Sequence, residues 1–251
     1  MVSQGLSSAQ IDEVWRPFVD WVKSSPEHFA FVSPLGSGAG DPRKMWDAST
    51  GNNWIRDPRE GAPPHHVWNR GDQGECGAFL HGYESLWLPA SLLQRDRRPL
   101  LVDALFAASR HKLVRFHLCK GLAGASDDAR KAALQTAMNP AVVNAFTLAI
   151  IADGEGAQYP GMAHPPLDLA AARRDARAID RAAAELRKIV PHPGSYVSES
   201  NYFNPTWQRA YWGDNYARLR AIKKRYDPDG LFCVHHGVGS EEWSADGFER
   251  L

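Results

Sequence analysis

The sequence predicts a globular fold that mixes strands and helices, and three observations support this. Residues 141–152 (AVVNAFTLAIIA) are almost continuously apolar, as is typical of a central strand. Residues 168–190 form a long stretch rich in alanine and arginine, which favours a helix. Hydrophobic residues make up 43% and charged residues 23% of the 251 residues, so one large or two small domains can bury a sizeable core.

Composition excludes several classes of partner. The formal net charge is zero, so nothing indicates binding to nucleic acid or to an anionic membrane. No apolar run approaches the roughly 20 residues that a membrane span needs. The first ten residues show no signal peptide, and the compartment stays undecided. Cys76, Cys119 and Cys233 form no metal-binding or CxxC pattern and are expected to be separate buried thiols.

The first predicted element is a helix. Ser7 and Gln10 have the spacing of a capping box, and apolar residues then recur on one helical face. Pro17 interrupts this pattern and is expected to kink or split the helix. Residues 28–33 are a short strand candidate.

The next part of the chain lacks regular periodicity. Residues 36–40 (GSGAG) have the order GxGxG instead of GxGxxG, so a plain turn is favoured over a phosphate-binding loop. Residues 47–72 are rich in Pro, Gly, Asn and Trp and predict a long irregular segment that covers or lines something. His65 and His66 lie in it without a third ligand at a suitable spacing, which favours a solvated loop over a metal site.

A strand–helix–strand pattern follows. Residues 79–93 predict a strand that reaches a turn at Pro89, and a helix begins at Pro99 and continues to Arg110. Residues 113–119 (LVRFHLC) alternate as a strand with Arg115 and His117 on one face. That face either lines a substrate pocket or is simply solvated, and the pattern favours neither.

The remaining elements are marked by caps and breakers. Ser126 caps a helix to about residue 137, and Asn139 and Pro140 end it ahead of the apolar strand 141–152. The long helix 168–190 comes next.

The last quarter predicts another helix and a strand. Gly213 breaks the chain, and Asp214 is expected to cap a helix that ends at Asp227, because the following proline disfavours helical geometry. The apolar residues 231–234 are predicted to form a buried strand, with residues 235–237 as a turn beyond it.

This last quarter resembles the C-terminal signature of the berberine-bridge-enzyme-like FAD-linked oxidases of the vanillyl-alcohol-oxidase superfamily. The resemblance depends on ordered matches over about fifty positions. They are Gly194, Tyr196 and Glu199; Trp207-Gln208; Trp212-Gly213, Asn215-Tyr216 and Arg218-Leu219; Ile222-Lys223; Tyr226-Asp227-Pro228 and Leu231-Phe232; and Gly237-Val238-Gly239-Ser240-Glu241. Residues 83–85 and 88–93 also look like the first strand of the family's substrate domain.

The resemblance implies an α+β fold with a mostly antiparallel sheet flanked by helices, whereas alternation of strands and helices alone favours a parallel sheet. Residues 1–193 would form the substrate domain, and residues 194–251 a segment that returns to the flavin. The family's N-terminal FAD-binding domain has no match in this sequence. It is expected to be lost by truncation or supplied by a separate chain.

The resemblance also implies roles for individual residues. Glu199 falls where the family places a base or proton acceptor facing the flavin, and Tyr196 would flank the pocket. A carboxylate in a partly dry pocket has a raised pKa, which suits proton abstraction. The alternative is that Glu199 pairs with a nearby arginine. Ser198 replaces the family's asparagine, so the polar contact of that residue with FAD is in doubt.

Three further residues, Asn215, Tyr216 and His236, are candidate FAD contacts, although capping and core packing explain them almost as well. With Arg115 and His117 as substrate-binding candidates, the sequence predicts a FAD-dependent oxidoreductase domain. It would move hydride from an alcohol or activated C–H of a small-molecule substrate to flavin. The alternative is a non-catalytic remnant that binds a small molecule or partner without flavin. An apolar patch where a flavin domain would dock distinguishes these hypotheses.

Overall fold

The computed structural model describes residues 5–32, 36, 38, 54–69, 77–118, 122, 124–158 and 164–251. The chain forms two compact units, Met1–Cys76 and Gly77–Leu251. The predicted division at residues 193 and 194 lies within the second unit and stays a prediction. Within the described residues, no helix is long and apolar enough to cross a membrane.

The first unit begins with helix α1 (Ser8–Lys23), and its predicted capping box is confirmed. The Gln10 amide N–H donates to Ser7 Oγ at 3.3 Å, while the Ser7 amide N–H donates to Gln10 Oε1 at 2.8 Å. Pro17 lies inside the helix, which is continuous, so the predicted split is not found. Residues 28–32 do not form the predicted strand. His28 ends a turn, in which the amides of His28 and Phe29 both donate to the Ser25 carbonyl, and residues 29–32 have no regular structure.

A β-hairpin corrects the prediction that residues 47–72 are wholly irregular. Strands β1 (Trp54–Arg56) and β2 (Val67–Asn69) pair antiparallel. The Asp57 amide also donates to the His66 carbonyl at 2.9 Å, which continues the pairing. Most of the glycine-rich stretch 36–40 lies outside the described residues, as do Cys76 and Cys119.

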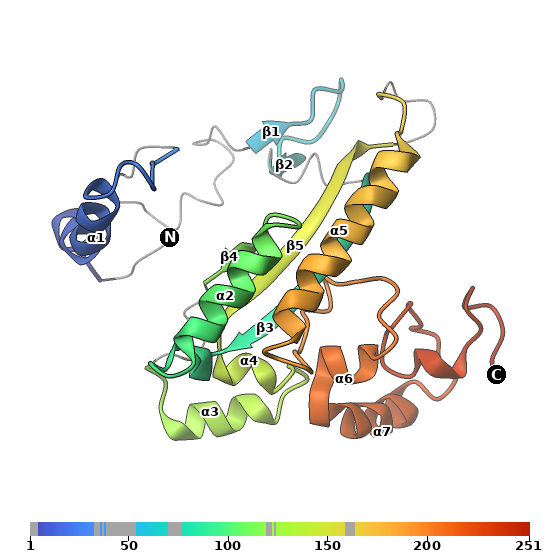
Figure 1. Ribbon diagram of the computed structural model, residues 1–251. Coiled ribbons are helices and arrows are strands. Elements are labelled where there is room, and N and C mark those ends of the chain that lie inside the picture. The colour runs from blue at the N-terminus through green and yellow to red at the C-terminus, as the bar shows by residue number, and fades with distance from the viewer. Residues whose placement is uncertain are drawn as a thin grey trace. The chain divides into compact units, whose positions relative to one another are not determined.

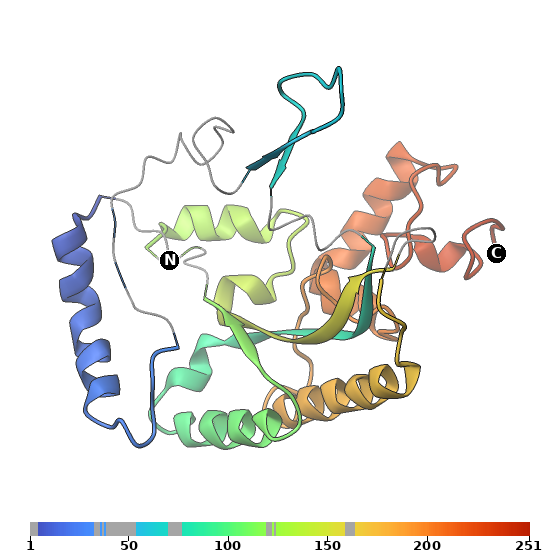
Figure 2. The ribbon, with the colours of Figure 1, turned by 90° about the horizontal axis from the view of Figure 1, so that it is seen from above.

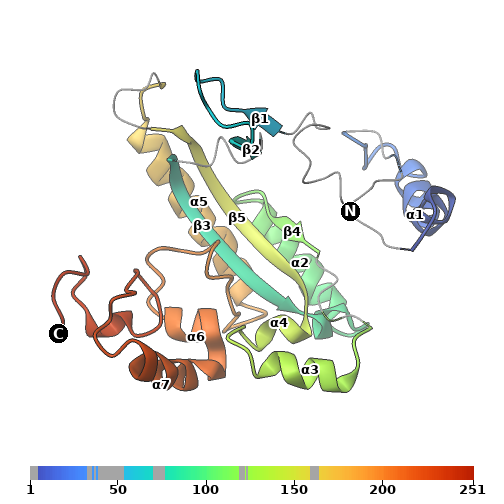
Figure 3. The same ribbon diagram turned by 180° about the vertical axis from the view of Figure 1, so that it is seen from behind.

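The second unit is built on an antiparallel sheet with the strand order β3-β5-β4 (Figures 1 and 3). Its strands are β3 (Ala78–Pro89), β4 (Arg115–His117) and β5 (Ala145–Ala157). The antiparallel sheet expected from the family resemblance is confirmed, and the parallel arrangement favoured by alternation is not formed by these strands.

Helices α2 (Arg98–Ser109) and α5 (Leu169–Arg187) pack side by side on one face of this sheet (Figure 2). Leu86 and Leu88 of β3 and Ile151 of β5 are fully buried beneath them, together with Ile179 and Leu186 of α5. Burial of each large side chain contributes roughly 1.5–3 kcal/mol relative to leaving it exposed. This core fixes the sheet against α2 and α5.

Short helices connect the strands. Strand β3 runs into a 3-10 helix (Ala90–Leu93), and Ser126 caps α3 (Asp127–Leu134) as predicted. The apolar run 141–152 begins with one helical turn, α4 (Ala141–Asn144), before β5 starts. Ahead of this turn, Asn139 Oδ1 accepts the Ala141 amide N–H at 2.9 Å.

The C-terminal quarter contains α6 (Trp207–Trp212), a 3-10 turn (Gly213–Asn215), α7 (Tyr216–Tyr226) and a short 3-10 helix (Ser240–Glu242). Gly213 breaks the chain with a φ of 54°. Asp214 does not cap α7, because the 3-10 turn holds it one residue away from the cap position. The helix ends at Tyr226, directly before Asp227 as predicted.

The predicted buried strand at residues 231–234 is wrong. Leu231 is 81% and Phe232 77% exposed. The Asp227 carboxylate accepts both their amides, at 2.8 and 3.1 Å, and Lys223 Nζ donates to the Phe232 carbonyl at 2.6 Å. Local side chains therefore satisfy the backbone groups that a strand partner would have bound. The turn at residues 235–237 is confirmed, since the Gly237 amide donates to the Val234 carbonyl.

The last residues of the chain are held to α7 by charge. Glu242 contacts Arg220 and Lys224 of α7 and Arg250 near the C-terminus. These cations, Arg220 first, lower the pKa of Glu242 to about 2.

Candidate functional site

One face of the sheet carries the predicted substrate-binding residues. Directly paired residues of antiparallel strands share a face, and Arg115 and His117 of β4 pair with Ile150 and Leu148 of β5. The same two β5 residues pair with Ser85 and Trp87 of β3. Leu86 and Leu88 point the other way, into the core under α2 and α5. Arg115 and His117 therefore lie on the face opposite these two helices.

His117 and Arg115 have different surroundings, although both are exposed. His117 borders an open pocket of about 730 Å³ at the end of the sheet. Arg115 is not among the residues that line this pocket. His117 thus borders a pocket and Arg115 faces solvent, and their role in substrate binding stays a prediction.

The segment that carries Tyr196 and Glu199 docks on the free edge of β3. The Trp87 amide donates to the Gly194 carbonyl at 2.9 Å, and the Tyr196 amide donates to Ser85 Oγ at 3.1 Å. Ser85 Oγ also lies 2.7 Å from the Oγ of Ser195. These contacts are buried or half-buried, so they hold the start of the C-terminal segment in register with the sheet.

Glu84 anchors the same segment, and it was assigned no role from the sequence. Its carboxylate is buried and accepts Arg187 Nη2 at 2.7 Å and Asn201 Nδ2 at 2.9 Å. Tyr211 completes the anchor by donating its hydroxyl to the Asn201 carbonyl at 3.1 Å. The signal that could have found this residue is a lone carboxylate within the otherwise apolar stretch 79–93, because a buried charge requires partners.

Asn139 is a second residue that the sequence analysis treated only as a helix breaker. It is buried, and its Nδ2 donates to the Ala210 carbonyl at 2.6 Å. The Ser195 amide donates to that same carbonyl at 2.7 Å. A methyl group on Gly194 would lie 2.7 Å from Asn139 Nδ2, so only glycine fits beside this junction.

Tyr196 and Glu199 lie close together at one tight turn. Tyr196 is 42% exposed, Glu199 is half-buried, and the Glu199 amide closes a tight turn onto the Tyr196 carbonyl at 3.0 Å. The Glu199 carboxylate has no hydrogen bond or ion pair within the described part of the chain, so the alternative pairing with an arginine is not found. A carboxylate in this state can accept a proton from a bound molecule.

The predicted FAD contacts are mostly engaged within the chain. Asn215 Nδ2 donates to the carbonyls of Leu134 and Met138, at 3.3 and 2.9 Å. The Tyr216 hydroxyl donates to Glu241 at 2.5 Å, and burial raises the pKa of this phenol well above its usual range. For both residues, the alternative role in structural support accounts for the contacts observed.

His236 takes part in a stack of four rings. It stacks on Trp207 with ring centroids 5.2 Å apart and on His235 at 3.8 Å, and His235 stacks on Tyr202 at 3.8 Å. Burial, followed by the neighbouring His235, lowers the pKa of His236, so its ring favours the neutral form. Ser198, the fourth predicted FAD contact, is exposed.

Only some of the predicted FAD-contacting residues are accessible to a cofactor. Tyr196, Ser198 and Glu199 offer polar contacts at one accessible turn, whereas Asn215 and Tyr216 already have partners. The residues present therefore fit contact with one part of FAD and not its enclosure.

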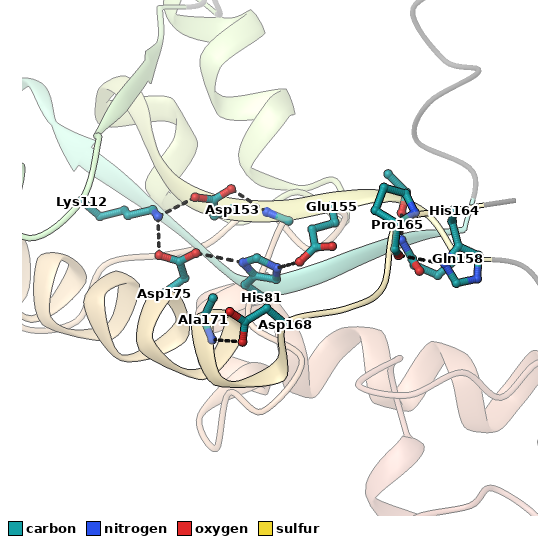
Figure 4. A network of polar contacts seen from close by, with 12 residues as sticks. His81, Lys112, Asp153, Glu155, Gln158, His164, Pro165, Asp168, Ala171 and Asp175 are labelled. Carbon is teal, nitrogen blue, oxygen red and sulfur yellow. Dashed lines mark hydrogen bonds and ion pairs between the residues drawn. The ribbon is translucent and has the colours of Figure 1, made fainter.

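A separate polar network ties α5 to the far end of the sheet (Figure 4). His81 of β3 lies between Glu155 of β5 and Asp175 of α5, 3.1 and 3.0 Å from its two ring nitrogens. Lys112 bridges Asp175 and Asp153, which raises the pKa of Lys112 and lowers those of both carboxyls. No group of described residues, here or at the histidines of the hairpin, has the arrangement of a metal site.

The fold is found in a known class of flavoproteins. The crystal structures of the VAO-type flavoproteins MtVAO615 and MtVAO713 from Myceliophthora thermophila C1 superpose on this chain with TM-scores of 0.56 and 0.60. Sequence identities are 21% and 18%, and the alignments cover 96% of this chain but only 38% and 37% of those proteins. The chain thus has the fold of one part of a VAO-type flavoprotein.

Sequence comparison identifies the part more closely. Residues 195–239 match the family described as berberine and berberine like. The chain is 42% identical over 89 residues to the VAO-type flavoprotein oxidase VAO615 of Thermothelomyces thermophilus. The aligned region covers 34% of this chain and 16% of that protein. It is 52% identical over 56 residues to the FAD-linked oxidoreductase notD' of Aspergillus versicolor, 22% of this chain and 9% of that protein. The predicted resemblance to a portion of a FAD-linked oxidase is confirmed.

Proposed function

We propose that this chain forms the substrate side of a FAD-linked oxidoreductase, in which a flavin domain, in the same polypeptide or in another, holds the cofactor. The observation that carries the proposal is the match of residues 195–239 to the berberine and berberine-like family, on a chain that covers 37–38% of VAO-type flavoproteins. The described residues fit contact with one part of FAD, which agrees with a division of the active site between two domains.

The roles of individual residues follow from the turn at residues 196–199. Glu199 would accept the proton of a substrate hydroxyl or activated C–H, because its carboxylate is half-buried and has no partner in the described part of the chain. Tyr196 would flank the substrate beside it. Bound FAD would supply the two-electron acceptor. In an alcohol substrate, the C–H bond would break with its electron pair leaving as hydride, the O–H proton would go to Glu199, and the electrons of the O–H bond would form the carbonyl of the product.

The interface for the flavin domain would be an apolar patch, defined here as Tyr202, Phe203, Leu231, Phe232 and Val234. All five are 59% to 82% exposed. Stacking of His235 on Tyr202 joins the two segments, and His235 Nε2 lies 2.8 Å from the Tyr202 carbonyl. Aromatic and aliphatic side chains clustered in this way on a surface are typical of a binding interface.

The same patch separates this proposal from the alternative of a non-catalytic remnant. A protein that no longer has a flavin domain is expected to carry polar side chains at this patch, because an apolar patch that stays exposed promotes aggregation. The patch therefore favours a chain that still meets a second domain.

The test is the variant Glu199→Gln, measured in the complex of this chain with a FAD-loaded flavin domain of a VAO-type flavoprotein. General-base catalysis contributes roughly 100- to 10,000-fold, so the rate constant of flavin reduction should fall by about that factor with little change in substrate binding. Glu185→Gln is the matched control, because Glu185 of α5 pairs with Lys188 of the same segment, and it should leave the rate unchanged. Equal rates for Glu199→Gln and wild type would remove Glu199 from the mechanism.

A further inference from the structure

The pocket beside His117 lies where β3 passes into the 3-10 helix 90–93 and where α3 and α4 approach the sheet. It measures about 730 Å³, within the range of roughly 300–1,000 Å³ that is typical of small-molecule sites. Trp87, Val142 and Phe146 contribute apolar walls. A pocket of this kind takes a ligand with a ring or a branched apolar body.

The charged groups on the walls of this pocket are cationic or can become so. Arg130 of α3 is half-buried, and its Nη2 donates to the Val143 carbonyl at 3.3 Å. Within the described residues it has no carboxylate partner, and neither does His117. Among the described residues that line the pocket, none is Asp or Glu. Arg130 thus keeps donors available for an anion, held in place by its contact with Val143.

The remaining polar groups of the wall also suit an acceptor. Gln94 and Asn144 line the pocket with exposed amide side chains.

We propose that this pocket binds the carboxylate of an aromatic or apolar acid, with the carboxylate on Arg130 and the apolar body against Trp87 and Phe146. Planar guanidinium groups bind carboxylates through two parallel hydrogen bonds, and the His117 imidazole lines the same pocket. That such an acid is the substrate oxidised by the enzyme rests on the proposed function. The binding of the acid does not depend on the proposed function, because residues of this chain form the pocket.

The experiment is calorimetric titration of the full chain, without flavin, with 1-naphthoate and with the neutral 1-naphthalenemethanol. Naphthoate should bind at least about tenfold more tightly than the alcohol, because only the anion gains the charge-assisted hydrogen bonds of Arg130. Arg130→Gln should remove this preference and leave the affinity for the alcohol unchanged. Arg130→Lys keeps the charge and should retain part of the preference.

Lys131→Gln is the matched control, because Lys131 is the next residue of α3, is 77% exposed and contacts Asp128 and not the pocket. It should leave both affinities unchanged. Equal affinities for the acid and the alcohol, or the same preference in Arg130→Gln as in wild type, would overturn the proposal, as would absence of binding. Such a result would leave the proposed function standing, since the effect of Glu199→Gln on flavin reduction is measured separately.

Discussion

Glu84→Gln is the substitution that best tests how the candidate site is held together. The Glu84 side chain is 7% exposed, and it joins β3 to Arg187 of α5 and to Asn201 of the C-terminal segment. Glutamine has the same shape, and one of its two terminal atoms remains an acceptor. Its amide NH₂ group is a hydrogen-bond donor and would face either Arg187 Nη2 or Asn201 Nδ2, which are donors themselves. Asn201 cannot simply rotate its amide, because its Oδ1 accepts the Phe203 amide at 2.8 Å.

The size of the effect follows from these contacts. A hydrogen bond to a charged group contributes about 1.5–3 kcal/mol when it is buried. The Arg187 side chain is 39% exposed, so water screens its part of the interaction and reduces its share to about 1 kcal/mol or less. Glu84→Gln is therefore expected to lower the free energy of unfolding by about 1–2.5 kcal/mol.

The assay is urea-induced unfolding followed by far-UV circular dichroism, with hydrogen exchange of the amides of residues 195–204 as a local readout. Exchange in this segment should accelerate more than in α2, because the segment loses its anchor to the sheet. Glu185→Gln is the control, since its partner Lys188 is 67% exposed, and it should change stability by less than about 0.5 kcal/mol. If Glu84→Gln were as stable as this control, the anchoring role would be refuted.

Three further substitutions test other parts of the fold. Gly194→Ala should cost about 1–3 kcal/mol through overpacking, whereas Gly156→Ala, which has open space around it, should cost little; thermal unfolding compares them. Lys112→Met should cost about 1–2 kcal/mol at neutral pH. Lys112 lowers the pKa of its two carboxyl partners below 3.8, so the ionised carboxylates stabilise the fold above that pH, and this stabilisation is lost as the pH falls. In Lys112→Met, the free energy of unfolding should therefore depend less on acid pH, which urea titrations at several pH values measure. Asn215→Ala should cost about 1–2 kcal/mol by freeing two carbonyls, and an unchanged unfolding midpoint would contradict this.

Much of the fold could be predicted, some of it from local signals and the sheet from the family resemblance. The capping box at Ser7, the cap at Ser126 and the break at Gly213 depend on neighbouring residues only, and all three are confirmed. The antiparallel order of the sheet depends on contacts distant in sequence. Alternation of elements indicated a parallel sheet, and only the resemblance led to the correct arrangement.

Two of the errors involve side chains that hydrogen-bond the backbone. Residues 231–234 have the composition of a strand, but Asp227 and Lys223 bind their backbone groups and leave the side chains in solvent. Asn139 likewise accepts the Ala141 amide at the start of the run 141–152, which begins with a helical turn. Such contacts depend on rotamers and on the path of the chain, which residue patterns do not specify.

The candidate site was predictable where it depends on one turn and not where it depends on long-range partners. Tyr196 and Glu199 could be identified from the resemblance, and they lie together at an accessible turn. The partners of Glu84 are 103 and 117 residues away in sequence, and no local pattern connects them. Asn215 and Tyr216 matched the family signature, but the signature does not distinguish a residue that contacts FAD from one that supports the fold.

The most direct test of the proposed function is the visible absorption of flavin after gel filtration of the chain with FAD. It is measured for the chain alone and for the chain mixed with a flavin domain of a VAO-type flavoprotein. We predict no retained flavin on the chain alone and a flavin band that co-elutes with both polypeptides in the mixture. Phe232→Lys, in the apolar patch, should abolish co-elution, while Phe106→Lys, on α2 and 68% exposed, should not. A flavin band retained by the chain alone, or co-elution unaffected by Phe232→Lys, would contradict the account.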